Sequence, residues 1–205
     1  IIICGENTMS DTQLHGLELR STVTSDGKLI LNLEPVAIDE PGPDEVIVQV
    51  EASPINPSDL GLLLGPADMA TLEASGTPER PVLTATIPPA RMGMMKPRLD
   101  ASMAVGNEGA GTVVRAGANV AGMLGKKVGM FGGSMYATYR KLLARDCSPL
   151  PEGATSADGA SMFVNPLTAL AMVETMKREG HVALVHTAAA SNLGQMLNKI
   201  CLADD

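Results

Sequence analysis

Residues 181–194, HVALVHTAAASNLG, decide the fold class of this chain. The apolar run at 182–185 predicts a short parallel strand that is buried on both faces. Ala189, Ser191 and Gly194 follow at the three small-residue positions of a dinucleotide-binding turn, although the first two are not glycine. Such a turn brings the backbone close to a pyrophosphate, whose charge is met by free N–H groups at the start of a helix.

The composition is that of a globular protein and argues against two classes of partner. Of the 205 residues, 45% are hydrophobic and 19% are charged. The net charge of −8 opposes binding to nucleic acid, and two Tyr, two Phe and no Trp leave few rings for stacking on bases. No apolar run approaches the roughly 18 residues of a membrane span. We therefore expect a small-molecule substrate, with no nucleic acid and no membrane.

The cysteines indicate a reducing compartment. Cys4, Cys147 and Cys201 stand far apart, and no Cys-x-x-Cys pair is present. Neither a structural zinc lobe nor a disulfide framework is expected from such spacing. We therefore expect a cytoplasmic protein.

The first part of the chain is predicted to be rich in β-structure. Turn signals separate strand-like runs at 28–38, 45–51, 112–115, 127–131 and 136–143. A short helix is expected over 60–64, capped by Ser58 or Asp59. Residues 65–99 have weak periodicity and predict a long surface excursion.

After residue 151 the pattern changes to helices followed by an α/β unit. Helices are expected over 157–163 and 166–177, the second with an apolar face of Leu167, Leu170, Val173 and Met176. Gly180 then ends this helix before the strand at 182–185. The sequence thus predicts three parts: an upstream or non-native segment at 1–8, a β-rich domain at 9–150 and an α/β domain that begins at 151–205.

Several segments in this order resemble the medium-chain dehydrogenase/reductase superfamily, in its zinc-free quinone oxidoreductase-like branch. They are VIVQVEASPINPSD at 46–59, GNEGAGTVV at 106–114, LPEG at 150–153, NPLTA at 165–169 and the turn that ends at Gly194. The resemblance implies an α+β and α/β chain, with a GroES-like β-barrel catalytic domain at 9–150. The first βα unit of a truncated Rossmann domain would follow at 151–205, with the active site in the cleft between the domains.

The resemblance also bears on zinc. Zinc-dependent relatives have a cysteine where this chain has Asn56 and a histidine where it has Asn107. Amide side chains are poor zinc ligands beside thiolate and imidazole, so we expect no catalytic zinc and no metal residues.

The chemistry implied by the resemblance is hydride transfer from NADPH, with NADH not excluded, to a quinone or an activated alkene or carbonyl. It places Asn56 beside the nicotinamide and substrate as the catalytic residue, and Thr168 against the nicotinamide. Ala189, Ser191, Asn192, Leu193 and Gly194 would approach the pyrophosphate. No Tyr follows at 62–68, which disfavours a tyrosine-assisted enoyl-thioester reductase. The full-length form is expected to be a homodimer.

Two other readings of the sequence stay open. One is a cofactor-binding relative without catalytic activity. The other is an inactive catalytic-domain fragment, because a single Rossmann strand without parallel neighbours would leave Val182 and Leu184 poorly buried. The choice between NAD and NADP stays open as well, since the residue that meets the ribose lies about 20 residues past the turn.

Overall fold

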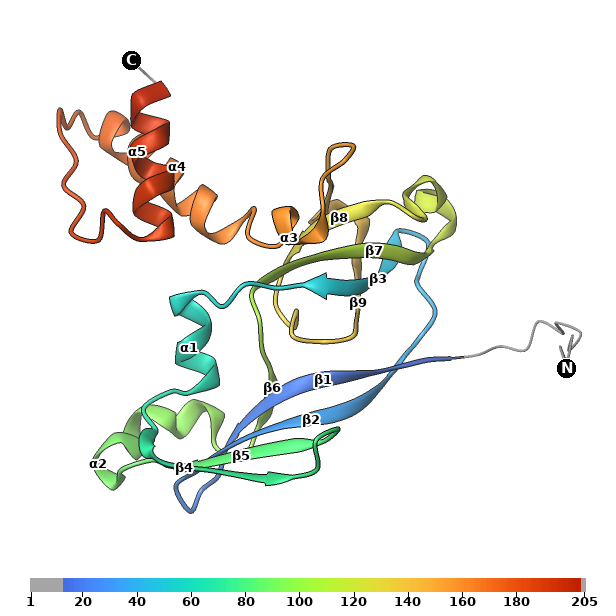
Figure 1. Ribbon diagram of the computed structural model, residues 1–205, viewed down its shortest axis with the longest axis vertical. Coiled ribbons are helices and arrows are strands. Elements are labelled where there is room, and N and C mark those ends of the chain that lie inside the picture. Colours follow the sequence, from blue (N-terminus) through green and yellow to red (C-terminus); the bar gives the residue numbers. More distant parts are fainter. Residues whose placement is uncertain (1–12, 204–205) are drawn as a thin grey trace, which may run out of the picture.

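The computed structural model describes residues 13–203, so the expectation for the segment at 1–8 lies outside the described residues. Within this range the chain forms two five-stranded antiparallel sheets, followed by a helical part that extends to one side (Figure 1). No helix in this range is long and apolar enough to cross a membrane.

The first sheet has the order β4-β5-β2-β1-β6. A long hairpin forms its centre, because β1 pairs with β2 over ten consecutive residues. Its inner face, with Val23, Leu29 and Leu31, packs on Leu63 and Ile87. The strands are β1 (Leu14–Val23), β2 (Lys28–Ile38), β4 (Asp68–Gly76), β5 (Pro81–Thr86) and β6 (Ser102–Ala104).

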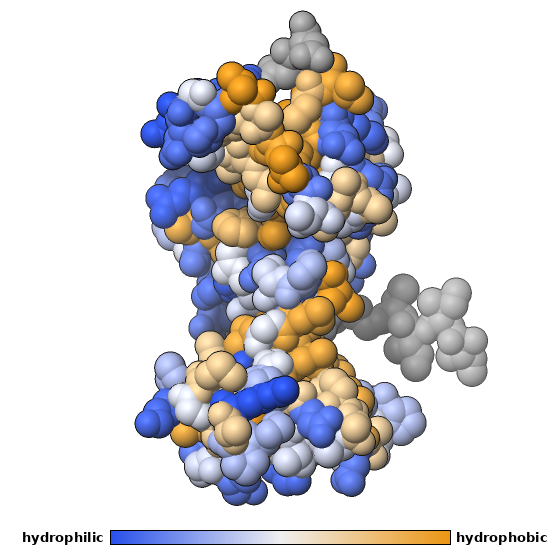
Figure 2. All heavy atoms as spheres, turned by 90° about the vertical axis from the view of Figure 1, so that its left-hand side faces the viewer, coloured by the Kyte–Doolittle hydropathy of each residue, from blue (hydrophilic) through white to orange (hydrophobic). Residues whose placement is uncertain are grey.

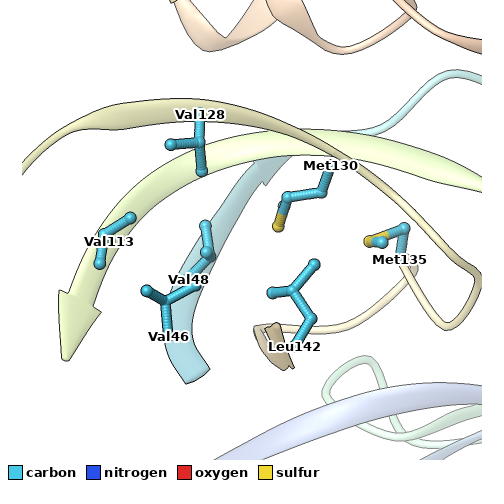
Figure 3. Close-up of a cluster of buried hydrophobic side chains, with 7 residues drawn as sticks. All are labelled: Val46, Val48, Val113, Val128, Met130, Met135 and Leu142. Atoms are coloured by element: carbon cyan, nitrogen blue, oxygen red, sulfur yellow. The ribbon is translucent and has the colours of Figure 1, made fainter. Parts of the chain in front are cut away.

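The second sheet has the order β10-β8-β7-β3-β9. Its strands are β3 (Glu45–Ala52), β7 (Glu108–Ala116), β8 (Lys127–Phe131), β9 (Tyr139–Leu143) and β10 (Cys147–Pro149). Because aromatic residues are scarce, the core is built from branched aliphatic and thioether side chains. Figure 3 shows these side chains pointing toward one another: Val46, Val48, Val113, Val128, Met130, Met135 and Leu142.

The segment 136–138 connects the two sheets. The Leu19 N–H donates to the Tyr136 carbonyl (2.8 Å), and the Val50 N–H donates to the Thr138 carbonyl (3.0 Å). These few bonds do not close the sheets into a barrel, and residues 13–203 contain no closed barrel. The expected β-barrel is therefore corrected to two sheets, each with its own edge strands.

Helices lie at the ends of the sheets and in the C-terminal part. They are α1 (Pro57–Leu63), α2 (Pro89–Met92), α3 (Ser156–Gly159), α4 (Val164–Arg178) and α5 (Asn192–Ala203). Helices α4 and α5 pack through Ala169, Val173 and Leu197. The expected apolar face of α4 is wrong in part, because Leu167 and Leu170 are exposed. Helix α5 and Leu184 pack on a different face of α4.

The region 65–99 also differs from the expected surface excursion. It contains the hairpin of β4 and β5 and then α2, with a 3₁₀ helix over Gly93–Arg98. The half-buried guanidinium of Arg98 donates to the Leu62 carbonyl (2.9 Å) and to Ser21 Oγ (2.7 Å). Pairing of β5 with β2 decides this structure, and such long-range pairing leaves little local signal.

The expected strand at 182–185 is not formed. These residues have no strand partner, and Val182 and Val185 are 99% and 90% exposed. A strand is defined by hydrogen bonds to a neighbour, so β-branched residues alone do not create one. The helix that follows the turn is confirmed as α5.

Candidate active site

The first candidate loop lies directly before the N-terminus of α1. Asn56 is the N-cap residue, and its backbone N–H donates to the Asp59 carboxylate (2.8 Å). Both side chains are 3% exposed. The expected cap by Ser58 or Asp59 is therefore corrected, because Asp59 is the third residue of the helix and completes a capping box that Asn56 opens.

Asp59 also binds the second candidate loop, residues 106–108. Its other carboxylate oxygen accepts from the Asn107 backbone N–H (3.0 Å), while the Asn107 side chain donates to Ser58 Oγ (3.0 Å). The ring of Tyr136 lies over Gly106, and its hydroxyl donates to the Pro54 carbonyl (2.8 Å). Burial and the Asp59 charge raise the pKa of Tyr136, so this phenol stays protonated at neutral pH.

Glu108, at the start of β7, is the acceptor on which three segments converge. Its side chain is 1% exposed. One oxygen accepts from Asn56 Nδ2 (2.8 Å), and the other accepts from the backbone N–H groups of Phe163 (2.8 Å) and Val164 (3.0 Å). Charge-assisted bonds of this kind compensate a buried carboxylate, which would otherwise be costly.

The first turn of α4 completes this cluster. Asn165 Nδ2 donates to Asn56 Oδ1 (3.3 Å), so the loop at Asn56 and the start of α4 are in direct contact. Thr168 lies one turn further along, is exposed, and donates its hydroxyl to the Val164 carbonyl (2.7 Å). It lines an open cavity of about 560 Å³ between α4 and residues 181–186.

The small-residue turn stands apart from this cluster, at the N-terminus of α5. Ser191 Oγ accepts from the Gly194 N–H (3.1 Å) and donates to the Ala188 carbonyl (2.7 Å). A Cβ at Gly194 would lie 2.5 Å from the Ala189 carbonyl oxygen. Gly194 is thus required for close packing of the helix on the turn, which is the role of the third glycine in dinucleotide-binding turns.

The residues that stand in place of zinc ligands form an amide network instead. Asn56 and Asn107 bond to Glu108 and Ser58, respectively. Among residues 13–203, no three His, Cys, Asp or Glu side chains gather closely enough to hold a metal ion. This donor set does not fit zinc, because amides bind it weakly.

Sequence reasoning left Glu108 and Asn165 out of the candidate site, although both belong to it. A signal for Glu108 was present. It is an acidic residue within the small and apolar run 106–114, and such residues are buried only when they are paired. Asn165 was recognised only as part of the motif at 165–169, and only the fold shows that its side chain lies against Asn56.

Comparison with solved structures shows which proteins share this fold. A protein from Mesorhizobium loti that is assigned as an NADPH:quinone reductase is 27% identical, with a TM-score of 0.64 over 96% of this chain. The chain resembles reductases of the medium-chain dehydrogenase/reductase superfamily and has their fold. An enoyl thioester reductase from Candida tropicalis has the same fold, at 23% identity and a TM-score of 0.59 over 91% of the chain. The chain spans about half the length of each superfamily member, 54% and 51% respectively.

A curated protein of a different kind is similar to part of this chain. Squalestatin hexaketide synthase from Phoma sp. is 35% identical over 91 residues, which are 42% of this chain and 4% of that protein. No family model matches the chain.

Proposed function

We propose that this chain contributes the catalytic part of an NADPH-dependent reductase that transfers hydride to a quinone or to an activated alkene or carbonyl, without zinc. The observation that carries the proposal is the Asn56–Glu108–Asn165 cluster. It joins the functional loop of the first part to the start of α4 through neutral amides and one carboxylate. The quinone and enoyl reductases among the similar structures support this class of reaction.

The turn at the start of α5 fits a dinucleotide. Ala189 and Gly194 would allow close approach of the backbone. Ser191 precedes the helix and Asn192 and Leu193 begin it, and the N-terminal N–H groups of the helix would meet the pyrophosphate. Thr168 is exposed on α4 and would contact the nicotinamide. NADPH, when bound, would supply the hydride.

The chain itself would orient the substrate and stabilise negative charge on its oxygen. An amide does not titrate near neutral pH, so Asn56 would donate a hydrogen bond rather than transfer a proton. Its amide is held from two sides by Glu108 and Asn165. Such preorganisation is what a hydride transfer without a metal requires.

The test is cofactor binding followed by turnover. NADPH is titrated into the 205-residue chain and its fluorescence is followed, and NADPH oxidation is then measured with naphthoquinones and α,β-unsaturated ketones. We expect binding and oxidation, with Thr168→Val raising the KM for NADPH about tenfold through loss of one contact. Leu170→Ala, an exposed change on the same helix, is the matched control. Binding without oxidation would leave the non-catalytic relative as the function.

A second candidate function is reduction of an enoyl thioester. The fold shared with an enoyl thioester reductase favours it. The absence of Tyr at 62–68 argues against the tyrosine-assisted form. Crotonyl-CoA added to the same acceptor panel separates the two candidates, because a thioester-specific enzyme would leave the quinones unreduced.

A further inference from the structure

We infer that Glu108 is a positioning residue that fixes helix α4 against Asn56, so that one buried carboxylate holds the two halves of the active site in register. The consequence for catalysis rests on the proposed function, whereas the structural role does not. The three donors to Glu108 are one amide side chain and two backbone N–H groups, none of which carries a formal charge. The carboxylate is therefore stabilised by the geometry of these donors.

The first half of this role is the capping of α4. The leading N–H groups of a helix have no intrahelical acceptor, and the N-cap residue of α4 is Phe163, whose side chain cannot accept a hydrogen bond. Glu108 comes from β7 and supplies the missing acceptor to Phe163 and Val164. Its negative charge also lies at the positive end of the dipole of a 15-residue helix.

The second half is the orientation of the Asn56 amide. A carboxylate can only accept hydrogen bonds, so it selects the NH₂ group of Asn56 and turns Oδ1 toward Asn165 Nδ2 (3.3 Å). A glutamine at position 108 would not impose this choice, because it can accept or donate.

Glu108 binds both the Asn56 amide and the start of α4, so it couples these two parts of the site. Val164 accepts from the Thr168 hydroxyl and donates to Glu108, so a shift of Val164 moves the attachment point of Thr168. Loss of Glu108 would therefore disturb the residue proposed to contact the nicotinamide, although Glu108 itself is 1% exposed and would touch no ligand.

The experiment measures amide hydrogen exchange at Phe163 and Val164 by NMR in the 205-residue chain. Asn56→Asp places a second carboxylate against Glu108, and like charges at this distance should speed exchange at both amides about tenfold or more. The double variant Asn56→Asp with Glu108→Gln should bring exchange back to within about threefold of the parent. The introduced glutamine amide can then donate to the new carboxylate while its carbonyl accepts from α4.

Asp158→Asn is the matched control. Asp158 is exposed and completes the capping box that Thr155 opens on the short helix α3, so its change should leave exchange at Phe163 and Val164 at the parent rates. Recovery in the double variant is a result that general destabilisation would not produce. Exchange unchanged in Asn56→Asp, or faster still in the double variant, overturns the inference.

Turnover adds a second readout that separates the two proposals. If the parent chain oxidises NADPH, Asn56→Asp should lower kcat and raise the KM for NADPH, and the double variant should recover the KM. If the parent chain shows no NADPH oxidation, the proposed function fails. The exchange rates still decide whether Glu108 holds α4 in place.

Discussion

At the scale of single residues, two close approaches decide where backbone segments lie. A Cβ on Gly111 would overlap the Gln49 carbonyl oxygen, so β7 can lie this close to β3 only with glycine there. A Cβ on Gly194 would lie 2.5 Å and 2.6 Å from the carbonyl oxygens of Ala189 and Ala188. Sequence reasoning selected Gly194 for its place in a motif, and the structure supplies a steric reason for the same residue.

Gly194→Ala should destabilise the chain by about 1–3 kcal/mol, because the added methyl group meets backbone atoms that have little room to shift. The measurement is urea denaturation followed by circular dichroism. Gly61→Ala in α1 is the control, since nothing lies within 4 Å of its Cβ. We expect this control to stabilise the chain by about 0.5–1 kcal/mol, as alanine does in helices. Equal stability of both variants would contradict the packing argument.

At the scale of elements, short helices are held by polar side chains rather than by their own length. Helix α1 has seven residues, and Asp59 anchors its first turn while Arg98 donates to the Leu62 carbonyl in its last turn. Helix α3 has four residues, and Ser156 within it donates to Glu51 of β3 (2.6 Å). Helices this short are unstable alone, so tertiary hydrogen bonds decide where they form.

The bond between α3 and Glu51 should make this part of the chain sensitive to acid. Hydrogen bonds from Ser156 and then Thr112 lower the pKa of Glu51. A lowered pKa adds stability above the ordinary glutamate pKa of about 4.3, and this stability is lost as the pH falls through the lowered value. The side chain is 36% exposed, so the effect should be small.

In Glu51→Gln the free energy of unfolding should therefore fall less steeply with decreasing pH below about pH 5 than in the parent. Its dependence on pH should change little at higher pH. Urea midpoints measured from pH 3 to pH 8 test this expectation. Glu152→Gln, in the loop before α3, serves as the exposed control. An acid limb as steep in Glu51→Gln as in the parent would rule the linkage out.

At the scale of the whole molecule, the C-terminal part leaves apolar surface uncovered. Apolar residues lie on the upper part of the face in Figure 2, which carries α4, α5 and the segment between them. Val182 and Val185 are 99% and 90% exposed, beside the cavity of about 560 Å³ that α4 lines with Met172 and Met176. Exposed patches of this kind bind hydrophobic dyes or promote association.

The chain should therefore bind the dye ANS and associate at high concentration, and Val182→Ser with Val185→Ser should reduce both several-fold. Fluorescence titration and light scattering after size exclusion measure the two effects. Leu124→Ser, at a 60% exposed residue outside the cavity lining, is the control and should change neither. Dye binding that is unaffected by the valine changes would place the apolar site elsewhere.

Much of the site could be predicted only as a set of separate segments. The Asn56 loop and residues 106–108 were recognised from their motifs, and the structure brings them together through Asp59 and Glu108. The cap of α1, the buried face of α4 and the partners of Glu108 were wrong or missing. The partners of Glu108 come from segments more than 50 positions away, and the buried face of α4 depends on α5, so local periodicity does not indicate either one. The cap of α1 is local, because Asn56 and Asp59 are three positions apart, and the sequence pattern of a capping box could have predicted it.

The sequence by itself determined the features that a short stretch of backbone can specify: the strands over 28–38 and 127–131, the small-residue turn and the helix after it. The tertiary structure decided whether each predicted element formed and what it touched. Residues 182–185 are as rich in β-branched side chains as a strand, yet they stay unpaired because no neighbouring strand accepts their hydrogen bonds. Glu108 became the centre of the candidate site because the fold brings the N-terminus of α4 and the Asn56 amide to the same carboxylate.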